Sequence, residues 1–209
     1  MRIRKKPNLD ARMERCANLL ATDPQALRGL WLDGFGYGKL YVELGCGKGR
    51  FTVETAKAEP EVFIAALEKS ANVMITALEL AARENLRNLR FINGLADNIP
   101  DYFAPEEISK IYINFCDPWP ANRHAKRRLS GRRFLELYKH ALHPGGEIHF
   151  KTDNLPLFEF SLCEFEACGF TATEITRDLH RNGPVGLMSD YELMFHNQKT
   201  AVYHGIFRS

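Results

Sequence analysis

The chain has 209 residues, 45% of them hydrophobic and 26% charged, a balance that is typical of a globular protein and excludes an intrinsically disordered one. No apolar run approaches the roughly 20 residues of a membrane-spanning helix, and the basic first residues lack the apolar stretch of a secretory signal, so we expect no membrane partner. The formal net charge of +2 excludes binding of nucleic acid by overall charge and leaves only local basic patches.

Predicted helices and strands alternate through the first half of the chain. The hydrophobic pattern predicts a helical segment over 10–32, interrupted by a proline, and then a flexible glycine-rich joint. It continues with strands over 40–44, 62–67 and 89–92 and helices over 50–58 and 71–86. We expect residues 1–38 to form a basic N-terminal arm with a helical segment, and residues 39–209 to form the main domain.

The second half continues this alternation. The pattern predicts strands over 108–115 and 147–151, helices over 132–142 and 157–167, and a β-rich tail from residue 170 that ends in a strand over 201–207. The whole order predicts an α/β fold with a doubly wound parallel sheet and crossover helices on both faces. Ligands bind such sheets at the carboxyl ends of the strands, so the residues that follow each strand are the candidates for chemistry.

The first strand end carries Glu43 followed by three closely spaced glycines, Gly45, Gly47 and Gly49. Glycines allow a sharp turn and a close approach to a ligand. A dinucleotide loop has the spacing G-x-G-x-x-G, and its pyrophosphate would be repelled by Glu43, whereas the sulfonium of S-adenosylmethionine would be attracted. The spacing disfavours a nicotinamide-dependent dehydrogenase and favours S-adenosylmethionine, with a purely structural turn as the alternative.

Three further acids follow predicted strands. Glu68 lies where nucleotide-binding folds place a carboxylate on the ribose hydroxyls, or it caps the helix that follows. Asp117 begins the run Asp-Pro-Trp-Pro, a rigid corner whose Trp119 offers a face for a flat base or packs in the core. Asp153 follows the next strand. Because guanine presents adjacent N–H donors, two carboxylates in an aromatic and basic setting favour guanine in a nucleic acid.

Basic residues gather in two runs that contain no acid. The first comprises Arg2, Arg4, Lys5 and Lys6, and the second, over 123–133, comprises Arg123, Lys126, Arg127, Arg128, Arg132 and Arg133. The second run directly follows the Asp117 corner and is well placed for phosphate contacts. A solvated face is the alternative for both runs.

Cysteine and histidine spacing indicates neither metal nor thiol chemistry. The odd number of five cysteines favours reduced thiols in the cytoplasm. Cys163 and Cys168 are not at zinc spacing, and His140 and His143 lack partner ligands, so we expect no metal. Cys116 would suit a covalent C5-methyltransferase only as an activated thiolate; we interpret it as structural, on the face of a buried strand that it shares with Tyr112 and Asn114.

The segments VELGCGKG, NFCDPWPANRHAKRR and HFKTDN, together with Glu68, resemble the bacterial tRNA (guanine-N7-)-methyltransferase family. The resemblance extends over roughly residues 38–208. It implies a seven-stranded Rossmann-like methyltransferase sheet with an antiparallel last strand. It also implies transfer of the methyl group of S-adenosylmethionine to N7 of a guanosine in the variable loop of tRNA. Whether the chain acts as a monomer or a homodimer stays open.

Matched motif by motif, the resemblance implies roles for individual residues. The residues that would bind S-adenosylmethionine are Glu43, Gly45, Gly47, Glu68, Leu95, Ala96 and Asp117, of which Asp117 would be catalytic. Those that would bind the substrate are Ala121, Asp153, Ser189, Asp190, Tyr191 and Glu192. Those that would contact RNA are Arg123, His124, Ala125, Lys126, Arg127 and Arg128.

Three positions depart from the family pattern. Leu95 stands where an acid or amide is usual near the adenine, and we expect backbone groups to take over that contact. Ala121 replaces a lysine and removes one cationic substrate contact, whereas Ser189 replaces a threonine and keeps the hydroxyl.

The expected reaction needs no catalytic base, because guanine N7 carries a free lone pair. The protein must align the base and stabilise the positive charge that develops on the purine. We expect Asp117, together with Asp153, to do both. The target base must also leave its stack. A non-catalytic RNA-binding protein with the same fold is the alternative function.

Overall fold

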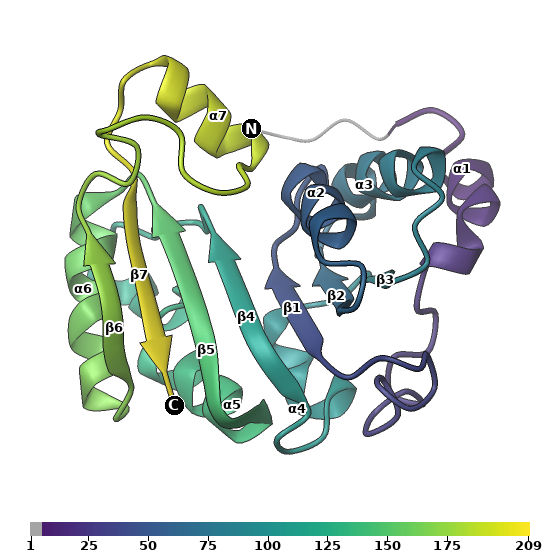
Figure 1. Cartoon of the computed structure of the whole chain (residues 1–209), viewed down its shortest axis with the longest axis horizontal. Helices are drawn as coiled ribbons and strands as arrows, with labels where there is room; N and C mark the ends of the chain where they lie inside the picture. Colours follow the sequence, from purple (N-terminus) through teal and green to yellow (C-terminus); the bar gives the residue numbers. More distant parts are fainter. Residues whose placement is uncertain (1–5) are drawn as a thin grey trace.

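The computed structural model describes residues 6–209, in which strands and helices alternate along the chain (Figure 1). The strands are β1 (Leu40–Leu44), β2 (Phe63–Leu67), β3 (Leu89–Ile92), β4 (Ile108–Asn114), β5 (Leu142–Thr152), β6 (Thr171–Thr176) and β7 (Tyr203–Arg208). The helices are α1 (Leu9–Arg15), α2 (Arg50–Ala58), α3 (Ala71–Arg83), α4 (Ile99–Tyr102), α5 (Arg132–Ala141), α6 (Leu155–Ala167) and α7 (Asp190–Asn197). Short 3₁₀ segments occupy Ala17–Leu19, Ala96–Asn98 and Asn122–Arg127.

The seven strands form one sheet in the order β3-β2-β1-β4-β5-β7-β6. The first five pair in parallel, whereas β7 is antiparallel to both β5 and β6. The predicted α/β sheet with an antiparallel last strand is thereby confirmed. The order reverses between β1 and β4, so the carboxyl ends of these two strands flank the switch point at which ligands bind doubly wound sheets.

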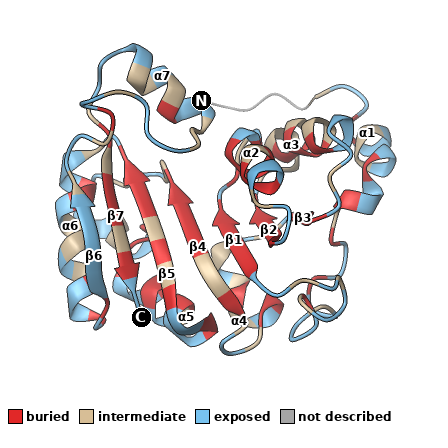
Figure 2. Ribbon diagram, in the orientation of Figure 1, coloured by how far each residue is buried: buried red, intermediate tan, exposed pale blue. Residues whose placement is uncertain are grey.

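Each face of the sheet is covered by its own set of helices. On β1, Tyr41 packs with α1, α2 and α3, while Leu40, Val42 and Leu44 pack with α4, α5 and α6. Figure 2 shows the central strands as the buried centre of the molecule and β6 as its exposed edge. The sheet is therefore a rigid platform that holds fixed whatever follows the strands.

The N-terminal segment differs from the expected helix over 10–32. Only α1 and the short turn Ala17–Leu19 are helical, because the chain then runs beside β3, where Leu20 bridges to Phe91, and continues in turns. Trp31 is fully buried, and its indole N–H donates to the carbonyl of Tyr102 over 2.8 Å. Arg2, Arg4 and Lys5 of the first basic run lie outside the described residues.

One predicted boundary and one missing helix in the C-terminal half are also corrected. β5 begins at Leu142 and not at 147: Ile108 pairs with Leu142 and Lys110 with Glu147, so residues 143–146 bulge out of the strand. The β-rich tail contains a helix, α7, which the hydrophobic pattern did not predict. Its start carries a capping box in which Ser189 and Glu192 bond each other's backbone N–H groups.

Candidate active site

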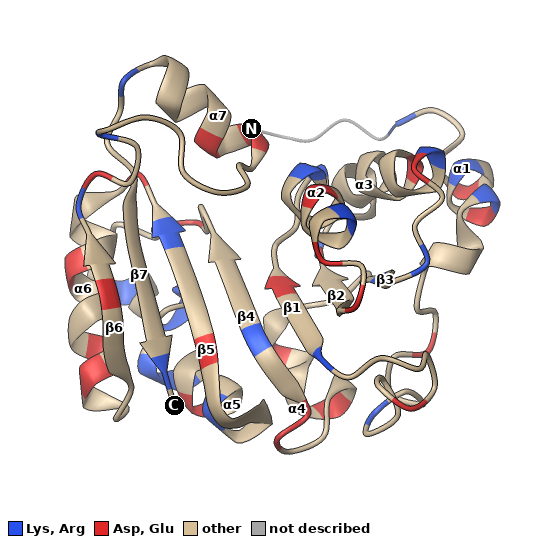
Figure 3. Ribbon diagram, viewed as in Figure 1, with Lys and Arg blue, Asp and Glu red and all other residues tan. Residues whose placement is uncertain are grey.

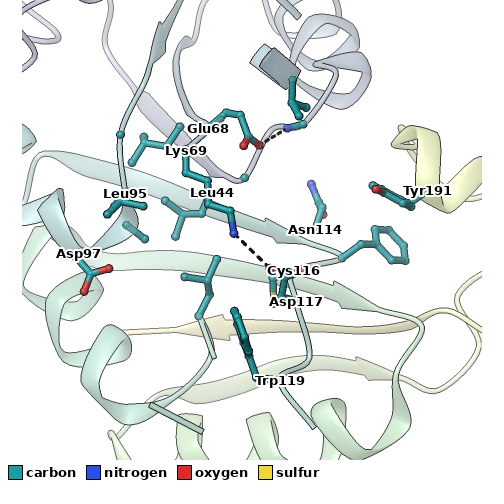
Figure 4. A pocket seen from close by; sticks show the side chains of 18 residues that line it. Leu44, Glu68, Lys69, Leu95, Asp97, Asn114, Cys116, Asp117, Trp119 and Tyr191 are labelled. Carbon is teal, nitrogen blue, oxygen red and sulfur yellow. Dashed lines mark hydrogen bonds and ion pairs between the residues drawn. The ribbon is translucent and has the colours of Figure 1, made fainter. Parts of the chain in front are cut away.

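A cavity of about 540 Å³ opens at the carboxyl ends of β1, β2 and β4 (Figure 4). Its wall includes Leu44, Gly45, Gly47, Glu68, Lys69, Leu95, Ala96, Asn114, Cys116, Asp117, Trp119 and Tyr191. The volume lies within the roughly 300–1,000 Å³ of small-molecule sites. The sheet thus brings together residues from five separate segments at the predicted edge.

The glycine turn after β1 forms one wall of the cavity. Gly45 and Gly47 have φ of 81° and 59°, a conformation that side chains rarely adopt, and a Cβ at either would meet open space. Gly49 has a different role, because a Cβ there would collide with Ala77 of α3. The turn therefore leaves backbone exposed to a ligand and lets α2 approach α3 closely.

Glu68 follows β2 and supports this turn. Its carboxylate accepts hydrogen bonds from the backbone N–H of Gly47 over 3.2 Å and from that of Ser70 over 2.9 Å. The side chain lines the cavity although the residue is only 9% exposed. Glu68 is thus held in a fixed orientation at the place where the sequence predicted a ligand-binding acid.

Glu43 lies behind the cavity and not in its wall. It is 2% exposed, and its carboxylate accepts hydrogen bonds from the hydroxyl of Thr52 and from the amide of Asn114, the latter over 3.3 Å. Burial raises the pKa of Glu43 to about 7, and these two hydrogen bonds oppose the rise. Asn114 itself reaches the cavity, and its buried Oδ1 has no hydrogen-bond partner among the described residues.

Asp117 stands on the opposite wall, after β4. Its carboxylate lies 3.3 Å from the ammonium of Lys69, which reaches across the cavity from the end of β2 (Figure 4). Both side chains are mostly exposed. Asp117 is therefore positioned at the mouth, with its charge accessible to a ligand. Lys69 and Asn114 were missed by the sequence analysis, although both occupy strand-end positions.

The corner after Asp117 is built around Trp119. Trp119 adopts a φ of 44° and lines the cavity, and the guanidinium of Arg127 lies 4.8 Å from the centre of its ring. The guanidinium of Arg128 donates to the carbonyls of Pro118 and Trp119 over 3.1 and 3.0 Å and packs over the ring of Phe160. These bonds to backbone hold the corner in an unusual conformation.

The predicted RNA-contacting segment contains both exposed and buried residues in this arrangement. Arg123, Lys126 and Arg127 are exposed, whereas His124 and Ala125 are half-buried. Arg128 is only 9% exposed and is engaged with the corner, so its guanidinium is not free for a phosphate, contrary to our expectation. Its structural role could not be inferred from a run of cations.

The predicted substrate residues of α7 are also divided. Tyr191 lines the cavity, and Asp190 faces Arg50 at 3.9 Å. Glu192 is fully buried, where it meets the ammonium of Lys151 and the ring of His180, so it is not exposed to a substrate in this structure. Lys151 and His180 had not been singled out.

Several other predicted residues lie at or near the same edge. Leu95 and Ala96 line the cavity, and the side chain of Leu95 is exposed. Ala121 and Asp153 are exposed but do not line the cavity.

Cys116 lies after β4, at the cavity wall and not within the strand. Burial raises the pKa of Cys116 to about 12, so the group is a thiol at neutral pH, which disfavours a covalent mechanism. Within residues 6–209 no three His, Cys, Asp or Glu side chains are grouped to hold a metal. The same residues contain no helix long and apolar enough to cross a membrane.

The chain is similar to known proteins over most of its length. Residues 38–205 match the family Methyltransf_4, described as "Putative methyltransferase". The tRNA (guanine-N(7)-)-methyltransferase of Geobacillus thermodenitrificans (strain NG80-2) is 40% identical over 205 residues, covering 97% of this chain and 95% of that protein.

Solved structures with low sequence identity share the fold. The 16S rRNA methyltransferase KamB superposes with a TM-score of 0.64 at 14% identity and covers 82% of this chain and 88% of its own. A variant of the 16S rRNA (adenine(1408)-N(1))-methyltransferase from Catenulisporales acidiphilia, solved with cosubstrate SAM, gives 0.59 at 15% identity over 90% and 91%. The family match and the 40% identity across 97% of the sequence show that the chain that forms this cavity is a member of the tRNA (guanine-N(7)-)-methyltransferase family.

Proposed function

We propose that this protein transfers the methyl group of S-adenosylmethionine to N7 of a guanosine in the variable loop of tRNA. The observation that carries the proposal is that Glu68 and the glycine turn face Asp117 and Trp119 across one cavity. The relative from Geobacillus, which is named a tRNA (guanine-N(7)-)-methyltransferase, supports the assignment of the substrate. The structural neighbour that was solved with SAM supports the assignment of the methyl donor. We place this work in the cytoplasm, and we assign it to residues 39–209, with residues 1–38 as an accessory arm.

The residues of the cavity fit S-adenosylmethionine. A carboxylate has about four acceptor positions, and Glu68 uses two of them on backbone N–H groups, so it can still accept hydrogen bonds from ribose hydroxyls. The open space above Gly45 and Gly47 admits a ligand against the backbone. The unpartnered Oδ1 of Asn114 is a further acceptor, and the ammonium of a methionine moiety would satisfy it. Leu95 and Ala96 offer backbone groups to an adenine.

When bound, S-adenosylmethionine supplies an electrophilic methyl group on a sulfonium cation. Guanine N7 needs no deprotonation, so the protein contributes alignment and electrostatics. Asp117 at the mouth accepts hydrogen bonds from guanine N–H groups and stabilises the positive charge that develops on the purine. Trp119 supplies an aromatic surface beside it. Glu43 adds an acid behind the wall; burial raises its pKa to about 7, and the positive charge of a bound methyl donor would favour its ionised form.

Exposed cations of the 123–127 segment would bind the RNA backbone. Arg123, Lys126 and Arg127 project from the corner that also carries Asp117 and Trp119. Phosphate contacts of this kind position a nucleic acid without reading its sequence. We infer that they hold the tRNA while its guanosine enters the cavity.

The test is to incubate unmodified tRNA with labelled S-adenosylmethionine and to map the methylated nucleotide. We expect one label per tRNA, at N7 of a guanosine in the variable loop. A single-turnover experiment with excess protein separates the alternative of a non-catalytic RNA-binding protein, which would retain tRNA without transferring label. Methylation at another atom or base would refute the proposal.

A further inference from the structure

A second, smaller cavity of about 190 Å³ lies among α2, α3 and the start of α7. Three cations line it: Lys48 and Arg50 at the beginning of α2, and Arg83 at the end of α3. Thr76, Glu79 and Asp190 complete its polar wall. Its volume is below the roughly 300 Å³ at which small-molecule sites begin, so it suits one small group and not a nucleoside.

The two cavities adjoin each other along the chain. Gly47 lines the first and its neighbour Lys48 lines the second, while Tyr191 lines the first and Asp190 the second. The glycine turn and the first turn of α7 thus form the partition between them. In Figure 1, α2, α3 and α7 lie toward the end of the molecule to which the arrows of the parallel strands point. A nucleotide chain whose base occupies the first cavity therefore has its backbone near the second.

The charges around the second cavity do not cancel. Arg12 holds Glu79 with two hydrogen bonds of 2.7 and 2.6 Å, and Arg50 lies 3.9 Å from Asp190. Lys48 and Arg83 are exposed and form no ion pair or hydrogen bond with their side chains among residues 6–209. The charge of Arg83 is felt by Glu79, whose pKa is lowered first by its hydrogen bond to Arg12 and further by the charges of Arg12, Lys6 and Arg83. The cations around this concave surface therefore outnumber its two acids, Glu79 and Asp190.

Lys6 adds a further cation to this surface. Its ammonium donates to the hydroxyl of Thr76, a residue of the same cavity wall. The pKa of Lys6 is lowered, first by burial and then by the nearby charges of Arg12 and Lys48. Together these effects outweigh the charge of Glu79, which raises the pKa. Figure 3 shows basic positions on α1 and α2 and in the chain that leads into α1. We call Lys6, Lys48, Arg50 and Arg83 the α2–α3 cationic cluster.

We propose that the α2–α3 cationic cluster binds a backbone phosphate of tRNA next to the target guanosine. Guanidinium and ammonium groups are the usual partners of phosphate, and the cavity has the size for one such group. The inference rests on the proposed tRNA substrate. The cluster and the exposed cations of the 123–127 segment flank the first cavity from different sides, so the RNA backbone is bound on both sides of the target base. Binding at both points opposes the return of an extruded base to its stack.

The test compares two double variants in tRNA binding as a function of salt. Lys48→Gln/Arg83→Gln removes the two unpaired cations, and Lys39→Gln/Arg87→Gln removes two exposed cations at the start of β1 and before β3, the opposite edge of the sheet. Each lost phosphate contact reduces the slope of log K against log salt by about 0.7–0.9. Because the cluster is proposed to bind one phosphate, we expect the slope to flatten by about 0.7–0.9 in the first variant and not in the second. Affinity for S-adenosylmethionine should be unchanged in both.

Three outcomes would overturn the inference while the wild-type protein still methylates tRNA. Equal slopes in the two variants would show that the cluster is a solvated surface. Weaker S-adenosylmethionine binding with an unchanged slope would assign the cluster to the methyl donor. Inhibition by inorganic phosphate at constant ionic strength, lost in Lys48→Gln/Arg83→Gln without a change in slope, would assign it to a free anion. Failure of the wild-type protein to methylate tRNA would instead refute the proposed function.

Discussion

Lys151 and Glu192 form a buried ion pair that joins β5 to α7, with the ammonium 2.8 and 3.1 Å from the two carboxylate oxygens. The ring of His180 lies 2.9 Å from the same carboxylate, and the backbone N–H of Ser189 donates to it over 3.4 Å. Glu192 is fully buried. It follows that Glu192 fastens the first turn of α7 to the sheet and thereby fixes Tyr191, the preceding residue, at the cavity.

Replacing Lys151 by methionine should destabilise the protein strongly. Removing one partner of a buried ion pair leaves an uncompensated charge and costs about 3–5 kcal/mol. The double variant Lys151→Met/Glu192→Gln removes both charges and should be more stable than Lys151→Met alone. Urea denaturation of the two variants and of Glu192→Gln completes the double-mutant cycle. Additive losses would show that the two residues are not coupled.

Glu68→Gln should weaken S-adenosylmethionine binding by roughly 10- to 100-fold, the effect of losing about 1.5–3 kcal/mol of charge-assisted hydrogen bonding. The amide of glutamine would also face the N–H groups of Gly47 and Ser70, which need acceptors. Isothermal titration calorimetry measures the change. Glu61→Gln, an exposed acid just before β2, is the matched control. If both variants bind equally well, Glu68 does not hold the methyl donor.

Asp117→Asn should bind both ligands and turn over far more slowly. Asparagine keeps the shape and removes the charge that meets the developing positive charge, so the loss should fall on kcat and not on KM. Lys69→Met is the matched control, because it removes the exposed 3.3 Å ion pair and leaves the carboxylate of Asp117 in place. An exposed pair contributes about 0.2–1 kcal/mol, so its kcat should change by at most about fivefold. A wild-type rate in Asp117→Asn would leave Asp117 as a strand-end residue only.

The cations of the 123–128 segment should separate into two groups. Lys126→Ala/Arg127→Ala should flatten the salt dependence of tRNA binding by about 1.5 units of slope without lowering the melting temperature. Arg128→Ala should instead lower stability by about 1.5–3 kcal/mol, since it removes the guanidinium bonds to Pro118 and Trp119. Thermal denaturation and filter binding distinguish the two. A stable Arg128→Ala variant with a reduced salt slope would restore Arg128 as an RNA contact.

Glu43 should make the stability of the protein depend on pH. Burial raises its pKa to about 7 from an ordinary value of 4.5, so the folded state binds this proton more tightly than the unfolded state. The resulting stabilisation is complete below pH 4.5 and is lost as the pH rises through 7. Relative to Glu43→Gln, which stays neutral, the wild-type protein should lose about 3 kcal/mol between pH 4.5 and 7.5. Urea denaturation at both pH values tests this, and a constant difference would contradict it.

The parallel core and its strand ends could be predicted because both depend on local sequence. Short apolar runs that end in glycine or an acid gave the positions of Glu68 and Asp117 directly. Contacts between distant segments could not be predicted in this way. Lys151 and Glu192 are 41 residues apart, so the resemblance implies a substrate role for Glu192 but no local pattern indicates its ion pair with a lysine of β5. Arg128 was grouped with its basic neighbours because no local signal distinguishes a guanidinium bonded to backbone from one in solvent.

The position of β7 in the sheet has a consequence for biosynthesis. β7 lies between β5 and β6, yet it follows both in the chain, and α7 belongs to the same connection from β6. While a ribosome is still making this segment, β5 and β6 have open edges that face each other across a missing strand, and open edges promote association between chains. Residues 203–208 close that gap, whereas α7 is joined to the sheet through Lys151 of β5. A variant in which β7 cannot pair would therefore expose the edge of β5 and should be prone to aggregation.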